Sequence, residues 1–216
     1  MTVDAVVPPG APPGGAAIRR AADATPFVRL VSHLLSLNLW SENGRAVLAD
    51  FDGAVGVRSA GSPQKATVRA VDGGLGVEHG LTAATGAVVE IGPAGRARVF
   101  TATSAEHRDR AERTVRLLDP ALPPWQDLAL FFWSAVRELR GMPSLRLVDT
   151  GTGEEVSLGG TPDPYEIHGD AEALTRLLAG QEFFADTVFA GGFRILGTFS
   201  QFSVVCGASM RVMWDV

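Results

Sequence analysis

The chain has 216 residues, of which 46% are apolar and 20% charged, and its net charge at pH 7 is -5. This length suffices for one large domain or two small ones with a buried core, and the composition is typical of a soluble globular protein. The acidic balance argues against nucleic-acid binding, which favours a basic face. Cys206 is the only cysteine, which excludes an intrachain disulfide and a thiolate metal cluster and favours a cytoplasmic location.

Targeting signals are not evident in the sequence. No run of about 18 apolar residues predicts a membrane span, and no basic segment followed by an apolar one predicts a secretory signal. Lys65 is the only lysine among many arginines, alanines and glycines, which indicates a GC-rich, bacterial genome. Residues 1–25 are rich in Pro, Gly and Ala, so they are predicted to be a disordered tail. Residues 26–216 are predicted to form a single domain, with two coupled halves, 26–120 and 121–216, as the alternative.

The first predicted helix covers residues 26–39. Thr25 is a suitable N-cap, and Pro26 suits the first helical turn. Phe27 and Leu34 belong to an apolar stripe at helical spacing, which predicts one buried face.

Strands are predicted next, from residue 45 to residue 103. Three Gly-containing turns each separate two apolar segments, which is typical of hairpins. The predicted pairs of strands are 45–51 with 54–58, 65–71 with 75–78, and 87–91 with 96–103. Successive hairpins predict an antiparallel sheet with one face covered by helices.

Two helices should follow this sheet. Ser104 caps the first, at residues 105–118, which is charged and has a narrow apolar stripe. The second, at residues 124–140, is apolar around much of its girth, which indicates burial on several sides or a face toward a cavity. Separate runs of strands and helices favour an α+β fold with an antiparallel or mixed sheet.

The last part of the chain has a recognisable order of segments. Two extended segments precede a third, at residues 165–169, and a helix bearing Leu174, Leu177 and Leu178 then ends at Gly180. A Phe-rich connector, an extended segment at residues 193–197 and a final apolar helix complete the chain. Residues 65–80 and 144–159 also resemble each other as hairpins, which would make the N-terminal half a degenerate repeat.

This closing order resembles that of sterol carrier protein type 2 domains. The shared pattern is a helix ending in Gly180, then Gly192, Phe193, Ile195 and Gly197. The resemblance implies an α+β fold in which a sheet packs against helices and an apolar ligand lies between the two layers. The glycines also have a local explanation as a helix cap, a sharp turn and a point of close backbone approach.

Phenylalanine is concentrated in the same segment, since six of the eleven lie between residues 183 and 202. Such a concentration builds either an ordinary core or the wall of an apolar pocket. The leading hypothesis is a non-enzymatic carrier or binder of an apolar small molecule, such as a lipid, an acyl chain or a polyketide-like compound, without a cofactor or metal. The predicted wall consists of Leu128, Phe132, Leu178, Phe183, Phe184, Val188, Phe193, Ile195, Phe199 and Phe202.

Two alternatives remain open. One is an interaction module that closes a homodimer through the 124–140 helix and the apolar C-terminal segment. The other is an enzyme that acts on an apolar substrate, with His79 or His168 as base; Glu78 is adjacent to His79, and Asp170 lies two residues past His168. Cys206 has an apolar sequence context and is predicted to be a buried, inert thiol. No Gly-x-Ser-x-Gly or metal-ligand spacing is present.

Overall fold

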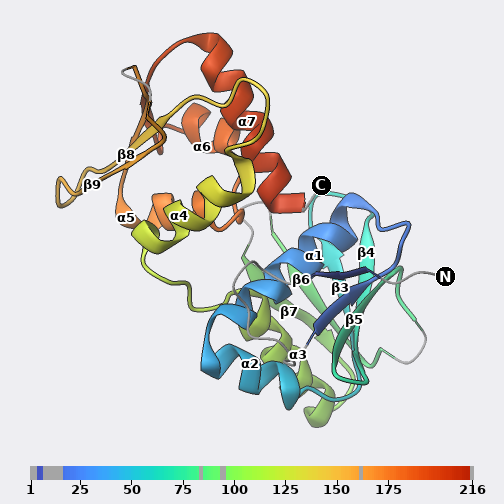
Figure 1. The fold of residues 1–216 in the computed structure, drawn as a ribbon. Coiled ribbons are helices and arrows are strands. Elements are labelled where there is room, and N and C mark those ends of the chain that lie inside the picture. The colour runs from blue at the N-terminus through green and yellow to red at the C-terminus, as the bar shows by residue number, and fades with distance from the viewer. Residues whose placement is uncertain (1–3, 7–16, 83–84, 93–95, 161–162, 215–216) are drawn as a thin grey trace. The chain divides into compact units, whose positions relative to one another are not determined.

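The computed structural model describes residues 4–6, 17–82, 85–92, 96–160 and 163–214. The chain forms two compact units, unit 1 at residues 1–122 and unit 2 at residues 123–216. Each unit contains its own sheet and its own helices (Figure 1). Both sheets mix parallel and antiparallel pairs, so the predicted α+β class is confirmed.

Unit 1 combines a seven-stranded sheet with three α-helices among its described residues. The strand order is β1-β2-β5-β4-β3-β6-β7. The bounds in chain order are β1 Asp4–Val6, β2 Ala17–Arg20, α1 Pro26–Ser36, the 3-10 turn η1 Leu37–Trp40, α2 Glu42–Ala49, β3 Ala54–Ser59, β4 Lys65–Val71, β5 Gly74–His79, β6 Ala87–Ile91, β7 Ala97–Ala102 and α3 Ala105–Leu118.

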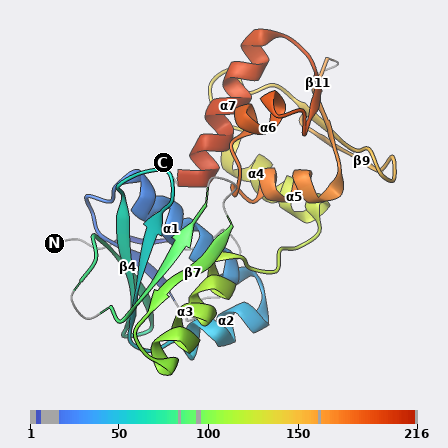
Figure 2. The ribbon, with the colours of Figure 1, turned by 180° about the vertical axis from the view of Figure 1, so that it is seen from behind.

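Helices α1 and α3 begin where the sequence predicts. The side chain of Thr25 accepts a hydrogen bond from the Val28 amide, and Ser104 does the same for His107. Both helices contact the same sheet, α1 at β2, β4 and β5 and α3 at β3, β6 and β7. Figures 1 and 2 show α1 against one face of this sheet from opposite sides. Alternate strand residues such as Val57, Val68 and Val77 are fully buried, which places the core of unit 1 on the helix side.

The strand predicted at residues 45–51 is wrong, because residues 45–49 belong to helix α2 and residues 50–51 follow its end. Ser41 caps the helix by accepting a hydrogen bond from the Gly44 amide at 2.9 Å. Gly44 and Leu48 are buried, and their separation of four residues suits one face of a helix. The Asp52-Gly53 turn therefore joins a helix to β3.

The sheet of unit 1 is mixed, whereas successive hairpins alone predict an antiparallel one. The β4–β5 and β6–β7 pairs are antiparallel as expected. Strand β3 pairs in parallel with β6, and β2 pairs in parallel with β5. Strands β1 and β2 come from the segment predicted to be a disordered tail, and Ile18 of β2 is fully buried; residues 1–3 and 7–16 of that tail lie outside the described residues.

Unit 2 has a four-stranded sheet in the order β11-β10-β8-β9. Its bounds in chain order are α4 Trp125–Val136, β8 Leu145–Asp149, β9 Glu155–Leu158, β10 Tyr165–Gly169, α5 Ala171–Leu178, α6 Phe184–Phe189, β11 Arg194–Leu196 and α7 Phe199–Trp214. Helix α5 contacts β8, α4 contacts β9, and α7 contacts α4, α5 and α6. Leu145, Leu147 and Ile167 point to this buried side of the sheet.

The helices of unit 2 differ from the sequence expectation in two places. Helix α4 ends at Val136, earlier than the predicted residue 140, and buries one face, since Leu130 on another face is 61% exposed. The Phe-rich connector contains the short helix α6. The end of α5 is as predicted: Gly180 follows it with a positive φ of 67°, a conformation that favours glycine.

The two sheets share a four-strand arrangement. In unit 1 the order β4-β3-β6-β7 combines an antiparallel, a parallel and an antiparallel pair. In unit 2 the order β9-β8-β10-β11 has the same three pairings in the same sequence. The shared strand arrangement therefore makes β3–β4 the counterpart of β8–β9. The sequence similarity between residues 65–80 and 144–159 instead aligns β4–β5 with β8–β9.

Candidate functional site

The ten residues predicted to line a pocket all lie in unit 2, but they differ in exposure. Some belong to its core, some are half-buried, and one is exposed at the surface. The buried residues are Leu128, Phe132, Leu178, Phe184 and Phe193, the half-buried ones are Phe183, Val188, Ile195 and Phe202, and Phe199 is exposed.

Six aromatic side chains of unit 2, which we name the aromatic cluster, form one connected group. Phe184 lies at its centre, with ring centroids 6.3 Å from Tyr165, 6.0 Å from Phe193 and 5.6 Å from Phe202. These separations lie within the range of favourable aromatic pairs. The members are Tyr165, Phe184, Phe189, Phe193, Phe199 and Phe202.

The aromatic cluster extends from the core of unit 2 to its surface. Phe184 is fully buried, whereas Phe189 is 81% exposed and Phe199 is 83% exposed. Half-buried Phe202 links the two ends, with centroids 6.2 Å from Phe189 and 5.9 Å from Phe199. Helices α6 and α7 carry these rings, so an aromatic path leads from solvent between them toward β10.

Glycines next to the aromatic cluster make room for its rings. A Cβ atom on Gly169 would lie 2.5 Å from Cδ1 and Cε1 of Phe193. A Cβ atom on Gly197 would lie 2.8 Å from Cε2 of Tyr165 and closer still to Cδ2. Real Cβ atoms do not come this close to ring carbons, so a larger residue at either position would have to displace a ring. The glycines therefore fix where β10 and β11 lie against the rings, in addition to punctuating the chain.

Tyr165, the only tyrosine of the chain, has an unusual position in the aromatic cluster. Its side chain is on the buried side of β10 and is 1% exposed. Among the described residues, its hydroxyl oxygen is the one buried side-chain polar atom without a hydrogen-bond partner. Burial raises the pKa of Tyr165 from an ordinary 10.0 to about 12, with a smaller contribution from Cys206.

A pH titration of the folded chain should show the raised pKa of Tyr165 directly. We expect tyrosinate absorbance to appear with a midpoint near pH 12, because burial disfavours the phenolate. Since the pKa is higher in the folded than in the unfolded state, the associated stabilisation is complete below pH 10 and is lost as the pH rises from 10 to about 12. The measurement is near-ultraviolet absorbance, with the urea-unfolded chain as reference; a folded-state midpoint at the ordinary value would contradict the burial of this phenol.

His168 lies on the opposite face of the same sheet, within a row of charged groups. Its Nε2 atom is 2.9 Å from Oε2 of Glu166, and its Nδ1 atom is 3.4 Å from Nη2 of Arg194. Arg146 approaches Glu166 at 3.4 Å, and the hydrogen bond from His168, followed by the charge of Arg146, lowers the pKa of Glu166 despite some desolvation. Residues 165 and 168 alternate to opposite faces of β10, so His168 cannot act on a ligand held at the aromatic cluster.

The carboxylates considered as partners of the two histidines have other roles. Asp170 accepts a hydrogen bond from the Ala173 amide at 2.7 Å and caps α5. Glu78 pairs with Arg69, with Oε1 2.9 Å from Nε, while the neighbouring His79 points to the other face of β5. The structure thus pairs His168 with Glu166, two residues before it, while Asp170, two residues after it, caps a helix.

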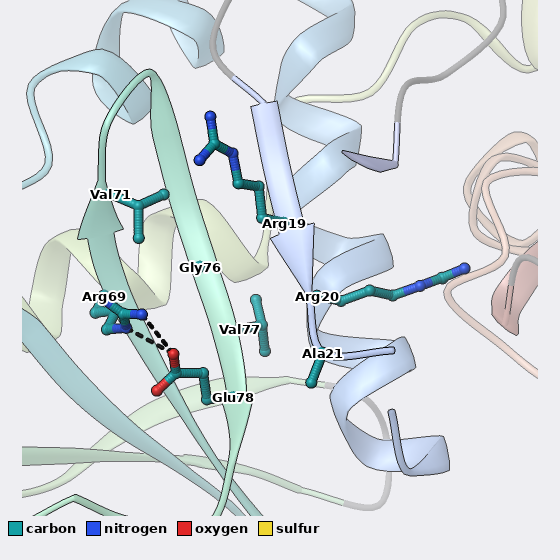
Figure 3. A pocket seen from close by; sticks show the side chains of 8 residues that line it. All are labelled: Arg19, Arg20, Ala21, Arg69, Val71, Gly76, Val77 and Glu78. Atoms are coloured by element: carbon teal, nitrogen blue, oxygen red, sulfur yellow. Dashed lines mark hydrogen bonds and ion pairs between the residues drawn. The ribbon is translucent and has the colours of Figure 1, made fainter. Parts of the chain in front are cut away.

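A separate hollow of about 150 Å³ lies in unit 1 and was not predicted from the sequence. Figure 3 shows Arg69 and Glu78 paired beside it, with Arg19 and Arg20 extending to opposite sides of β2. Gly76 pairs with Arg19 and Arg69 in neighbouring strands, and its missing side chain opens the space between them. The hollow is too small for a lipid-sized ligand, since such ligands occupy pockets of roughly 300–1,000 Å³.

Three other features could indicate a function in the described parts of the chain: a reactive thiol, a metal-binding group or a membrane-spanning helix. Cys206 is half-buried with a pKa raised by burial, which agrees with an unreactive thiol. No group of three or more His, Cys, Asp or Glu side chains in those parts could hold a metal ion. Nor does any helix there combine the length and apolarity required to cross a membrane.

Comparison with known proteins gives no assignment. No protein-family model matches the chain, and no curated protein matches it either.

Sequence reasoning omitted two members of the aromatic cluster, Tyr165 and Phe189. Tyr165 opens a strand and was interpreted as part of an extended segment, although it is the only tyrosine in the chain. Phe189 lies at the end of α6, a helix that the connector was not expected to contain. Its side chain therefore had no predicted direction.

Proposed function

We propose that unit 2 binds an apolar small molecule at the aromatic cluster. The observation that carries this proposal is the continuous aromatic path from exposed Phe189 and Phe199, through Phe202, to buried Phe184. Two phenylalanines that are more than four-fifths exposed place a large apolar area in water, and covering that area is favourable at about 25 cal/mol per Å². A ligand that separates α6 from α7 would contact the surface rings first and the buried rings next.

The order of elements in unit 2 also supports the proposal. Strand β10, helix α5, strand β11 and helix α7 follow the order that resembles the end of a sterol carrier protein type 2 domain. In such a domain an apolar ligand lies between sheet and helices, and the aromatic cluster occupies that layer here. The strand arrangement shared by the two units supports the idea of two related halves, with β3–β4 as the counterpart of β8–β9.

The expected affinity follows from the area that a small probe would bury. A molecule such as 2-ethylnaphthalene that loses roughly 250 Å² of apolar surface gains about 6 kcal/mol from burial. Association and ordering costs reduce this gain, so the expected Kd is no lower than about 0.05 mM. Longer apolar ligands would bind more tightly because they remove more surface from water. Equilibrium dialysis with the fluorescence of the naphthalene ring measures this range directly.

A double substitution at the surface rings tests the site. We expect Phe189→Ser with Phe199→Ser to weaken 2-ethylnaphthalene binding by about tenfold or more, because both rings contact the incoming ligand. Their exposure means that the fold should tolerate the changes, to within about 0.5 kcal/mol each. Leu130→Ser is the matched control, since Leu130 is a similarly exposed apolar residue of unit 2 that lies on α4. Equal affinities for the double variant and the wild type would refute the site.

A homodimer interface is the second candidate function, and the same exposed rings favour it. Aromatic side chains are enriched at such interfaces, and Leu130 adds an exposed apolar residue on α4. Sedimentation equilibrium of the wild type and of the Phe189, Phe199 double variant separates the two functions. A wild-type dimer that dissociates in the double variant would favour the interface, and a wild type that is monomeric and binds the probe would favour the ligand site.

A further inference from the structure

Tyr165 provides a polar contact in a cluster that is otherwise hydrocarbon. Its ring meets Phe184 edge to face, with an interplanar angle of 75°, and Gly197 leaves room for it on the other side. A phenylalanine would fill the same volume without burying a hydroxyl. The hydroxyl has no partner in the described chain, so it retains its capacity to donate one hydrogen bond.

Among the described residues, one ionisable side chain exerts an electrostatic influence on this hydroxyl. The other members of the aromatic cluster have no titratable group, and the ionisable side chain that influences Tyr165 is the Cys206 thiol. Burial raises the pKa of that thiol, which keeps it neutral. A carboxylate buried here would have one donor and no compensating cation, whereas a ketone, ester or alcohol oxygen needs only the one donor.

We infer that the ligand of the aromatic cluster is a neutral apolar molecule bearing a hydrogen-bond-accepting oxygen, and that the Tyr165 hydroxyl donates to that oxygen. This inference rests on the proposed binding site and specifies the chemistry of its ligand. The apolar body of the ligand would lie against the phenylalanines, and its oxygen would lie at the inner end of the aromatic path. Tyr165 thereby becomes a specificity residue that distinguishes oxygenated molecules from plain hydrocarbons.

Two nearly isosteric probes isolate the contribution of the hydroxyl. 2-Acetylnaphthalene carries a ketone oxygen where 2-ethylnaphthalene carries hydrogens, and both are neutral. In equilibrium dialysis, Tyr165→Phe should weaken binding of the ketone by about tenfold, the usual scale for one buried hydrogen bond, while affinity for the hydrocarbon stays within about twofold. A Tyr165→Phe variant that changes both affinities by the same factor, or neither, would overturn the inference.

An infrared measurement adds a readout that a purely structural role of Tyr165 would not affect. The carbonyl stretch of bound 2-acetylnaphthalene, labelled with ¹³C, should move to lower frequency in the wild type and not in Tyr165→Phe. The anion 2-naphthoate should bind more weakly than the ketone, and equal or tighter binding would refute the preference for a neutral ligand. If neither neutral probe binds the wild type, the proposed function fails. If both probes bind and Tyr165→Phe does not change the affinity for the ketone relative to that for the hydrocarbon, only the role of Tyr165 fails.

Discussion

Replacing Phe184 by Ala is expected to lower the free energy of unfolding by about 3–5 kcal/mol. Phe184 is fully buried, and its ring contacts three other aromatic rings, from β10, from the residue that precedes β11, and from α7. Its removal leaves a cavity at the point where these elements meet, and α6 has only six residues with which to close it. Both the lost burial and the unfilled cavity contribute to the cost.

Urea unfolding of the full chain, followed by tryptophan fluorescence, measures the effect of this substitution. Three of the four tryptophans, Trp125, Trp133 and Trp214, belong to unit 2. Phe199→Ala is the matched control, because the same ring is removed from a position that is 83% exposed, where substitutions change stability by about 0.5 kcal/mol or less. Similar stabilities for the two variants would show that the aromatic cluster is not part of the core of unit 2.

Gly169→Ala should destabilise unit 2 by about 1–3 kcal/mol, the usual cost of overpacking. The added methyl group would lie 2.5 Å from two ring carbons of Phe193 and 3.4 Å from the carbonyl oxygen of Gly192. Phe193 is buried, so its ring can move only by displacing its neighbours. The cost is therefore steric and localised at the contact between β10 and the residue that precedes β11.

A double-mutant cycle identifies Phe193 as the source of this cost. In a Phe193→Leu background, Gly169→Ala should cost at least about 1 kcal/mol less than in the wild type, because the rigid ring is gone. Gly207→Ala is the control: its new methyl group meets nothing within 4 Å, and it lies within helix α7, where alanine is favoured over glycine by about 0.5–1 kcal/mol. Additive effects of the Gly169 and Phe193 substitutions would contradict the packing described here.

The parts of the fold that were predicted correctly depend on local signals. Each of these signals acts within a few residues of the chain: the caps Thr25 and Ser104, the glycine that ends α5, and the turn between β4 and β5. The segment at residues 45–51 was assigned to a strand because a short apolar run fits both periods, and Ser41, which decides the matter, lies outside it. The parallel pairs β2–β5 and β3–β6 join residues far apart in sequence, so no local pattern indicates them.

The candidate site shows the same division between local and distant information. The phenylalanines concentrated in residues 183–202 lie on and beside α6, β11 and α7. Which rings are buried depends on how these elements pack, and sequence alone did not separate Phe184 from Phe199. The unpaired hydroxyl of Tyr165 depends on every neighbour of that atom, so it becomes visible only in the folded chain.

Strand β2 has a practical consequence for work on this protein. A segment rich in Pro, Gly and Ala is ordinarily trimmed before crystallisation, and a boundary at Thr25 would look natural from the sequence. That boundary would remove Ile18 from the core and uncover the hydrogen-bonding edge of β5, to which β2 is paired in parallel. Exposed strand edges promote association between copies. The N-terminal boundary chosen for expression is therefore expected to affect whether copies of the purified protein associate, and residues 17–20 should be retained.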